Sequence, residues 1–274
     1  MSKHKKNVQK IKEMYKDYTI HNELASGGTS HVYRVTDNET GETRVMKVTS
    51  FSRVPKQLWL NELNMLQKFQ YVRGIVKMYE FGEGFDANND SFGYCVLEMC
   101  DSDVFESPVP KQELLKFLSF VANILVTIHS LGYCYCDLKS ENILRKMNGY
   151  RLCDFSSCQP IGTHSTIIFG TLSVMAPEIR TATALKCEYV YDEKIDSWGF
   201  GCLLFELLTQ TTPDLTNNSN LLKSIQRITV DPTMDAGYRK IIELCLDNDP
   251  KRRATMQTVM RLIHDLVGDD VNKC

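Results

Sequence analysis

The 274-residue sequence predicts an α+β fold in which a strand-rich first part is followed by a mainly helical second part. Between residues 18 and 98, short apolar stretches alternate with polar turns, which is typical of strands. From Pro110 onward, apolar residues recur instead at the three- and four-residue spacing of helices. The chain is long enough to bury a sizeable core, either as one large domain or as two lobes.

The first part is expected to contain three strands within residues 18–48. A run of small residues at 25–30 and a polar turn at 37–42 separate these strands. Apolar residues at helical spacing then predict a helix over residues 58–69, with Glu62 on it. The three strands and this helix begin the first part.

Two further strands are expected at residues 74–79 and 93–98, joined by a polar turn at 83–91. Residues 100–103, Cys-Asp-Ser-Asp, then break the pattern and suggest a hinge. A long apolar helix is expected over residues 114–128. The first part therefore carries five strands and one main helix, and the second part begins with a buried helix.

Composition and charge exclude several classes of protein. With 43% hydrophobic and 24% charged residues, the chain has the composition of a soluble globular protein. A net charge of −2 argues against a nucleic-acid binder or a membrane-surface protein. The longest mostly apolar stretch, residues 117–128, is expected to be too short to span a bilayer. Residues 1–16 carry six lysines without the apolar core of a secretory signal, so we expect a cytoplasmic location, with a nuclear one left open.

The ten cysteines raise the question of disulfides or zinc. Cys134 and Cys136 are separated by one residue, and Cys153 and Cys158 by four. Neither spacing is the C-x2-C of common zinc sites, and histidines at the usual intervals are absent from the sequence. We expect reduced cysteines that serve as small apolar residues.

Residues 135–142 read YCDLKSEN, and residues 154–156, DFS, follow. The two segments resemble the catalytic loop, H-R-D-L-K-x-x-N, and the D-F-G motif of eukaryotic protein kinases of the Ser/Thr type. The resemblance implies a bilobal protein-kinase-like fold. Its small N-lobe would be a five-stranded antiparallel sheet with one main helix, and its larger C-lobe would be mainly helical. It also implies ATP and Mg²⁺ as cofactors.

The resemblance assigns a role to each charged residue of these motifs. Asp137 would accept the proton of the attacking hydroxyl, and Lys139 would stabilise the γ-phosphate, as in Ser/Thr kinases. Asn142 and Asp154 would bind the metal.

The other residues that it assigns to the ATP site lie mostly in the first part of the chain. Lys47 would contact the phosphates, held by Glu62, and the backbone of Glu98 and Cys100 would bind adenine beside Leu97 as gatekeeper. The full set is Leu24, Ala25, Gly27, Val32, Val45, Lys47, Glu62, Leu97, Glu98, Cys100 and Leu144.

Three departures from the family pattern stand out. The glycine-rich loop keeps only its middle glycine, Gly27, with Ala25 and Ser30 at the other positions. Cys136 replaces the arginine that in many members meets a phosphorylated residue, so we expect activity that does not depend on an arginine–phosphate latch. Ser156 replaces the glycine of D-F-G and narrows the backbone freedom there.

Downstream motifs extend the match. Residues 170–178, 196–201 and 249–255 resemble G-T-x-x-x-x-A-P-E, D-x-W-S-x-G and D-P-x-x-R-x-T. The resemblance implies that Asp196 holds backbone amides of the catalytic loop and that Arg253 pairs with Glu178.

The implied organisation is a basic leader at 1–16, a kinase domain at 17–268 and a tail at 269–274. Within the domain, the N-lobe would cover 17–100 and the hinge and C-lobe 98–268.

Three functions compete. An active protein Ser/Thr kinase is favoured by retention of the charged motif residues, while a pseudokinase acting as a nucleotide-binding or scaffold module is favoured by the three departures. A kinase of small molecules is disfavoured by residues 171–178, which resemble a platform for protein substrates. We expect a monomer with a protein substrate, no nucleic-acid substrate and no membrane partner; a regulatory protein partner is left open.

Overall fold

The computed structural model describes residues 17–27, 30–86, 89–147, 149–166, 170–211, 213, 220, 223–224, 226 and 234–271. The leader at 1–16 lies outside the described residues. The chain divides into two compact units. The first unit ends at Asp101 and leaves out residues 72–74, and the second unit comprises those three residues and the chain from Ser102 onward.

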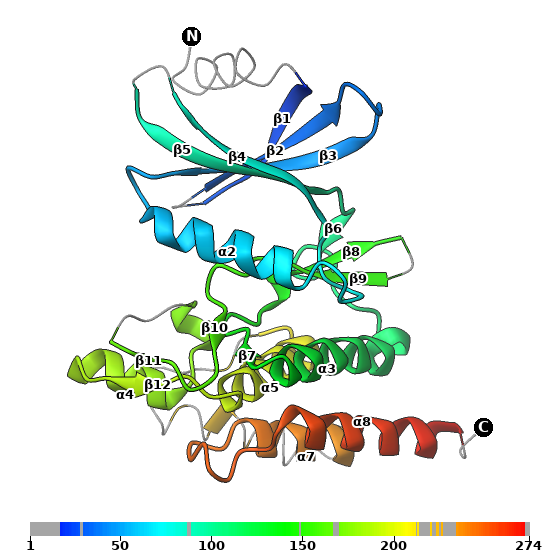
Figure 1. Cartoon of the computed structure of the whole chain (residues 1–274). Coiled ribbons are helices and arrows are strands. Elements are labelled where there is room, and N and C mark those ends of the chain that lie inside the picture. The colour runs from blue at the N-terminus through cyan, green and yellow to red at the C-terminus, as the bar shows by residue number, and fades with distance from the viewer. Residues whose placement is uncertain are drawn as a thin grey trace. The chain divides into compact units, whose positions relative to one another are not determined.

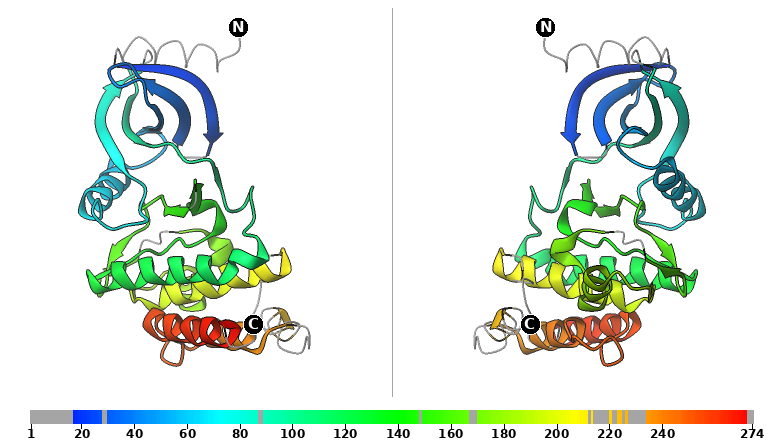
Figure 2. Two further views of the ribbon diagram at one scale, coloured as in Figure 1. Left: turned by 90° about the vertical axis from the view of Figure 1, so that its right-hand side faces the viewer. Right: turned by 90° about the vertical axis from the view of Figure 1, so that its left-hand side faces the viewer.

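The first unit is a five-stranded antiparallel sheet with one helix, as expected (Figure 1). The strand order is β1-β2-β3-β5-β4, which makes β1 and β4 the edge strands. Figure 2 shows the sheet strongly curved, with α2 against one side. The elements are β1 (Tyr18–Ser26), β2 (Ser30–Asp37), β3 (Thr43–Ser50), α2 (Lys56–Lys68), β4 (Met78–Phe85) and β5 (Ser91–Glu98).

Alternating side chains build the core on one face of this sheet. Its buried members are Tyr18, Ile20, Tyr33, Val35, Met46, Val48, Phe92 and Val96. The indole of Trp59 on α2 covers Gly93 of β5, where a Cβ would lie 2.4 Å from the ring. Gly93 is therefore required for the helix to pack this closely on the strand.

Two expected elements are displaced. The strand expected at residues 74–79 is instead Met78–Phe85, because Gly74 has φ +94° and its carbonyl accepts from Leu152 N of the second unit's β9. The polar turn expected at 83–91 is correspondingly short, since β4 runs to Phe85. The helix expected from residue 58 begins at Lys56, directly after Pro55.

The second unit is mainly helical. Its elements are β6 (Ser102–Asp103), η1 (Lys111–Glu113), α3 (Leu114–Ser130), β7 (Tyr133–Cys134), η2 (Ser140–Asn142), β8 (Ile143–Lys146), β9 (Gly149–Leu152), β10 (Gln159–Pro160), β11 (His164–Ser165), η3 (Leu172–Val174), α4 (Pro177–Leu185), β12 (Tyr189–Val190), α5 (Lys194–Thr209), α7 (Ala236–Cys245) and α8 (Met256–Val271).

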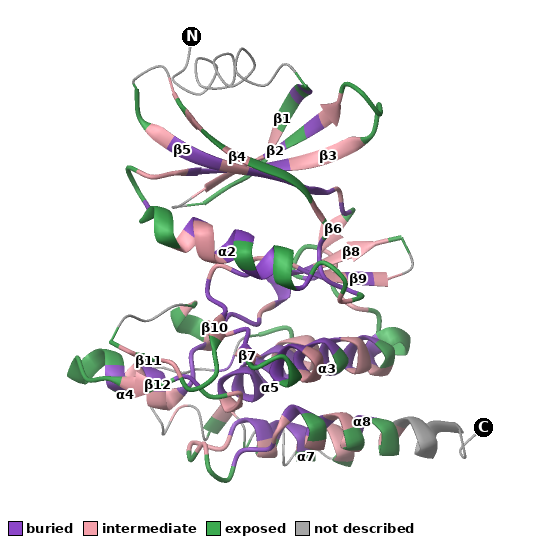
Figure 3. Cartoon of the chain, in the orientation of Figure 1, coloured by how far each residue is buried: buried purple, intermediate pink, exposed green. Residues whose placement is uncertain are grey.

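Helix α5 is the centre of this unit. It packs against α7, and α3 packs along α8 (Figure 1). Figure 3 shows burial concentrated on α3 and α5. Trp198 and Phe200 of α5 are fully enclosed. The described cysteines form no disulfide, and most of them are buried as apolar residues.

The apolar helix of this unit is longer than expected. The helical run Lys111–Ser130 has 20 residues, and by length and hydropathy it could cross a membrane, although residues 117–128 alone are too short to do so. The turn η1 and α3 continue each other beyond residues 117–128. Half of its apolar part is buried inside the protein, and the core helix of a globular domain has the same length, hydropathy and burial.

Candidate active site

Lys47 and Glu62 form an ion pair within the first unit. Lys47 lies on the central strand β3 opposite Cys95 of β5, and Glu62 lies on the buried side of α2. Lys47 Nζ donates to Glu62 Oε1 over 2.6 Å, with 14% of the lysine side chain and 4% of the glutamate side chain exposed. The enclosed carboxylate fixes the ammonium in one place, as the resemblance implied.

Strand register places other residues of this unit that the resemblance assigns to the ATP site in rows. Ala25 of β1 lies opposite Val32 of β2, and Val32 lies opposite Lys47 of β3. In a second row, Val45 of β3 lies opposite Leu97 of β5. The Val32–Lys47 pair and the second row follow from unbroken pairing across β2, β3 and β5, whereas the pairing of β1 with β2 shifts register just before Ala25. Leu24, in contrast, is 44% exposed at the edge strand β1.

The loop between β1 and β2 is only partly described. Gly27 N donates to Ser30 O over 2.9 Å, which closes the turn. A Cβ on Gly27 would meet no atom nearer than 3.8 Å, so the fold itself does not require glycine there. The neighbouring Gly28 lies outside the described residues. Open space at Gly27 is compatible with a close approach of the backbone to a phosphate.

Glu98 is engaged on both its amide and its side chain. Its N–H donates to Lys77 O, and its Oε1 accepts from Lys77 N, both over 2.9 Å. A ligand at Glu98 would therefore have to use its carbonyl oxygen. Cys100 is 8% exposed at the end of the first unit, whereas Leu144 belongs to β8 of the second unit.

Asp196 anchors the catalytic loop within the second unit. Its carboxylate accepts from Tyr135 N and Cys136 N over 2.7 Å each and lies 2.8 Å from His129 Nε2. The aspartate is 1% exposed at the start of α5. Because three donors surround one buried carboxylate, the backbone leading into Asp137 is held rigidly. This is the arrangement that the resemblance implied.

Both carboxylate oxygens of Asp137 are held. Thr171 N donates to Oδ1 over 2.8 Å, and Asn142 Nδ2 donates to Oδ2 over 3.1 Å and to the Asp137 carbonyl over 2.8 Å. Lys139 Nζ donates to Thr171 Oγ1 over 2.7 Å and lies 3.4 Å from Asp137 Oδ2. A carboxylate and an ammonium thus stand side by side on one short loop. Such a pair can accept a proton and stabilise a negative charge next to it.

Asn142 and Asp154 are brought together by a hairpin. Strands β8 and β9 pair from Ile143 with Leu152, and just beyond that pair Cys153 N donates to Asn142 O over 3.0 Å. The donor groups of Asn142 point at Asp137, which turns its side-chain oxygen away from that residue. An amide oxygen beside a carboxylate is the hard donor set that Mg²⁺ prefers, so these residues fit the expected metal.

Asp154 is held in an unusual backbone conformation. Its φ is +54°, in the left-handed region, and its Oδ1 accepts from the Ser156 hydroxyl over 2.7 Å and from Ser156 N over 3.3 Å. Sequence analysis identified Ser156 only as a restriction on the backbone. The hydrogen bond to the Asp154 carboxylate was missed, although aspartate side chains commonly accept hydrogen bonds from groups two residues further along the chain.

The side chain that replaces the arginine of H-R-D is turned inward. Cys136 Sγ lies 3.3 Å from Cys134 Sγ, and Cys134 is fully buried. Burial, reinforced by the hydrogen bond to Cys134, raises the pKa of the Cys136 thiol well above its ordinary value. The thiol is therefore neutral and cannot act as a cationic phosphate ligand. Among the described residues, no group of three or more His, Cys, Asp or Glu side chains could hold a metal.

Tyr135 makes a contact that sequence analysis missed. Its ring packs edge-on against Phe155 with centroids 5.3 Å apart. In addition, its hydroxyl donates to Cys153 O over 2.5 Å. This bond fixes the residue before Asp154 to the catalytic loop. No sequence pattern predicts this bond, because Cys153 contributes only its backbone carbonyl.

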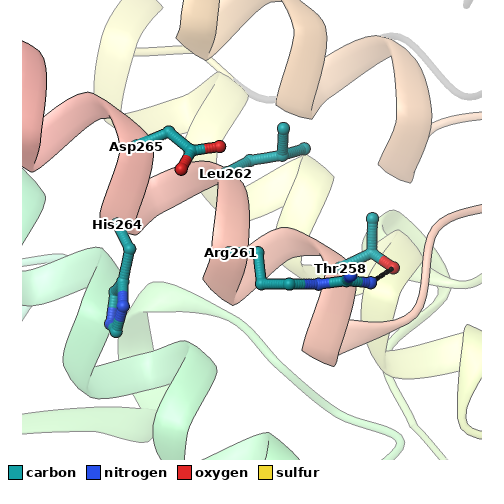
Figure 4. Close-up of a pocket in the computed structure, with 5 residues that line it drawn as sticks. All are labelled: Thr258, Arg261, Leu262, His264 and Asp265. Carbon is teal, nitrogen blue, oxygen red and sulfur yellow. Dashed lines mark hydrogen bonds between the residues drawn. The ribbon is translucent and has the colours of Figure 1, made fainter.

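A surface pocket elsewhere shares none of these residues. It lies along α8, as Figure 4 shows, and Arg261 donates to Thr258 Oγ1 across it over 3.2 Å. The lining residues are Thr258, Arg261, Leu262, His264 and Asp265. All of them come from one helix, and none is buried.

Comparison with known proteins agrees with this geometry. The chain is 26% identical to the probable serine/threonine-protein kinase pXi of Dictyostelium discoideum over 90% of its own length and 36% of that protein. It is 26% identical to the serine/threonine-protein kinase ppk30 of Schizosaccharomyces pombe, over 89% and 28%. It is also 26% identical to the serine/threonine-protein kinase PAK 1 of Mus musculus, over 93% and 48%.

The chain therefore spans less than half the length of these relatives. The family model of the protein kinase domain matches residues 18–264, which is most of the chain. The fold of each unit and the motif geometry of the second agree with that match. The chain belongs to the protein kinase domain family.

Proposed function

We propose that the chain is an ATP-dependent protein kinase that phosphorylates serine and threonine hydroxyls. The observation that carries this proposal is the network in which Asp137, Lys139, Asn142 and Thr171 contact one another. A scaffold has no need of a carboxylate and an ammonium held this closely. The relatives described above are serine/threonine kinases by name, which supports the same acceptor.

Each residue has a chemical role in this proposal. Asp137 accepts the proton of the attacking hydroxyl, and Lys139 stabilises charge on the transferring phosphoryl group. Lys47, held by Glu62, contacts the nucleotide phosphates. Mg²⁺, held by Asn142 and Asp154, would neutralise phosphate charge when bound.

Phosphorylation of the chain itself is not required in this proposal. Cys136 offers a neutral thiol where many family members have an arginine, so no charge-assisted contact to a phosphate can form there. The lysine-rich leader supports a cytoplasmic or nuclear location, and a monomer that acts on protein substrates is the simplest form.

A pseudokinase is the second candidate. It is favoured by Ala25 and Ser30, which replace glycines of the phosphate-binding loop. Such a protein would bind nucleotide or a partner without phosphotransfer.

A magnesium-dependent phosphotransfer assay separates the two candidates. Asp137→Asn and Lys47→Met are each expected to lower kcat/KM by at least about 100-fold, because each removes a group that acts in the transition state. The exposed Asp265→Asn and Lys116→Met are matched controls of the same chemistry and should leave activity unchanged. If the folded wild-type chain is no faster than Asp137→Asn, the kinase proposal is refuted and the pseudokinase remains as the candidate.

A further inference from the structure

The segment between Asp154 and Thr171 is tied to the catalytic loop at both ends. At its entry, Gln159 of β10 pairs with Cys134 of β7. At its exit, Thr171 N donates to Asp137 Oδ1 over 2.8 Å. The position of Thr171 therefore depends on how the described residues between these two ties, 160–166 and 170, are held.

The middle of this segment is held by a second strand pair. In β11 and β12, His164 lies opposite Val190 and Ser165 lies opposite Tyr189, in antiparallel register. The imidazole of His164 also lies 3.1 Å from the Glu188 carboxylate, although both side chains are about 60% exposed. An exposed ion pair contributes little to the stability of the strand pair. The backbone pairing is the main tie.

Two further backbone hydrogen bonds extend this pair. Gly162 N donates to Tyr191 O over 2.8 Å, and Tyr191 N donates to Thr163 O over 2.9 Å. Gly162 has φ +85°, a conformation that other residues adopt only with strain, and it turns the chain into β11. The glycine and the exchange of hydrogen bonds with Tyr191 fix where β11 begins.

The β12 side of the pair is anchored in the unit. Tyr191 is fully buried, and its ring lies 4.7 Å from that of Tyr189. Burial, reinforced by Tyr191 and by the thiols of Cys136 and Cys134, raises the pKa of the Tyr189 phenol.

We propose that residues 188–191 form a brace that orders residues 161–166 and so positions Thr171 beside Asp137 without phosphorylation. Gly162 and Tyr191 are its positioning residues. The brace rests on the proposed kinase function and adds its regulation. An arginine–phosphate contact is lost when the phosphate is removed, whereas backbone hydrogen bonds between β11 and β12 need no phosphate. The chain is therefore in its active arrangement as synthesised.

The first experiment compares two substitutions at one position in the full chain after phosphatase treatment. Tyr191→Pro removes the N–H that donates to Thr163, while Tyr191→Phe keeps the amide and the ring. Tyr191→Phe loses only the phenol hydroxyl, so we expect its amide exchange in residues 161–166 and its kcat to stay within about threefold of wild type. We expect Tyr191→Pro to speed amide exchange in residues 161–166 by at least about tenfold and to lower kcat by about tenfold, with the KM for ATP within about threefold of wild type.

A second variant covers the case in which Tyr191→Pro does not fold. Gly162→Ala places a Cβ in open space but strains the turn. It should therefore also speed amide exchange in residues 161–166 and lower kcat. Val190→Ala, at an exposed position of β12, is the control with no expected effect.

The outcomes are distinguishable. The brace would be refuted if the wild type were active only when phosphorylated. It would also be refuted if folded Tyr191→Pro or Gly162→Ala showed fast amide exchange in residues 161–166 and a normal kcat. A wild type that is inactive in every phosphorylation state, yet keeps protection in 161–166 that Tyr191→Pro abolishes, would refute the kinase function and support the structural tie alone.

Discussion

Ser156 gives the carboxylate of Asp154 a hydrogen bond that a glycine in its place could not make. The hydroxyl donates over 2.7 Å to Oδ1, and the backbone N–H reaches the same oxygen over 3.3 Å. Asp154 itself adopts φ +54°, so its side chain projects from a constrained backbone. Partners that orient a metal-binding carboxylate commonly determine the affinity of the site.

Replacing Ser156 should therefore weaken Mg²⁺ binding. We expect Ser156→Ala to raise the Mg²⁺ concentration needed for half-maximal nucleotide binding by about tenfold, because the carboxylate loses its orienting donor. Fluorescence of a labelled nucleotide measures this without turnover. Ser156→Thr keeps the hydroxyl and serves as the control, with binding close to wild type. Equal Mg²⁺ dependence for Ser156→Ala and wild type would contradict a positioning role.

At this scale the sequence predicted the kinds of residue better than their contacts. The pairing of Lys47 with Glu62 and of Asp196 with backbone amides followed from motif resemblance, and the structure contains both. The hydroxyl bonds of Ser156 and Tyr135 did not follow. Each depends on a backbone conformation or a backbone acceptor, and neither is encoded in the identity of a single residue.

Among the elements, α5 carries a carboxyl group that is costly to ionise. Glu206 Oε1 accepts from Ser140 Oγ over 2.8 Å, which joins the helix to the turn after Lys139. Burial raises the pKa of Glu206 above its ordinary value, although the hydrogen bond from Ser140 acts in the opposite direction. The folded chain therefore holds this proton more tightly than the unfolded chain.

Stability should consequently fall as the pH rises from the ordinary carboxyl pKa, 4.5, through the raised pKa of Glu206. Glu206→Gln keeps an acceptor for Ser140 and removes the titration. Above this pH window we expect the variant to melt about 2 °C higher than wild type, and below it the difference should disappear. Melting curves from pH 4 to pH 8 test this, with the exposed Glu243→Gln on α7 as control. A constant difference at every pH would show that the titration of Glu206 plays no part.

Elements with strong periodicity were predicted well, and short ones were not. The helix α3 and the strands β1, β2, β3 and β5 follow the expected patterns. Strand β4 is displaced because Gly74 supplies a carbonyl to Leu152, a long-range contact that local patterns do not contain. The two-residue strands β11 and β12 were missed, since two paired residues have no period to detect.

For the second unit as a whole, one ion pair joins segments far apart in the sequence. Arg253 Nη1 and Nη2 donate to the two carboxylate oxygens of Glu178 over 2.7 and 2.9 Å. Arg253 also donates to Lys194 O over 2.9 Å and to Asp247 O over 3.1 Å. It is 1% exposed, so α4, the start of α5 and the chain after α7 meet at one buried guanidinium. The resemblance implied the pair, but not the two carbonyls.

Replacing Arg253 should lower the free energy of unfolding more than replacing Glu178. Glu178→Gln leaves the guanidinium with its carbonyl partners and one side-chain acceptor, whereas Arg253→Met takes one donor from each of two carbonyls and both guanidinium donors from the carboxylate. We expect a loss of roughly 3 kcal/mol in the free energy of unfolding for Arg253→Met, and a smaller loss for Glu178→Gln, whose side chain is 26% exposed in the wild type.

Urea unfolding followed by Trp198 fluorescence measures both losses. The chain has two tryptophans, so a Trp59→Phe background leaves Trp198, whose ring lies 5.1 Å from the guanidinium, as the reporter for this unit. A larger loss for Glu178→Gln than for Arg253→Met would mean that charge neutralisation, and not the bonds to the carbonyls, dominates at this junction. The expected order instead makes Arg253 a hydrogen-bonding hub, because its bonds to the Lys194 and Asp247 carbonyls remain when the carboxylate is changed.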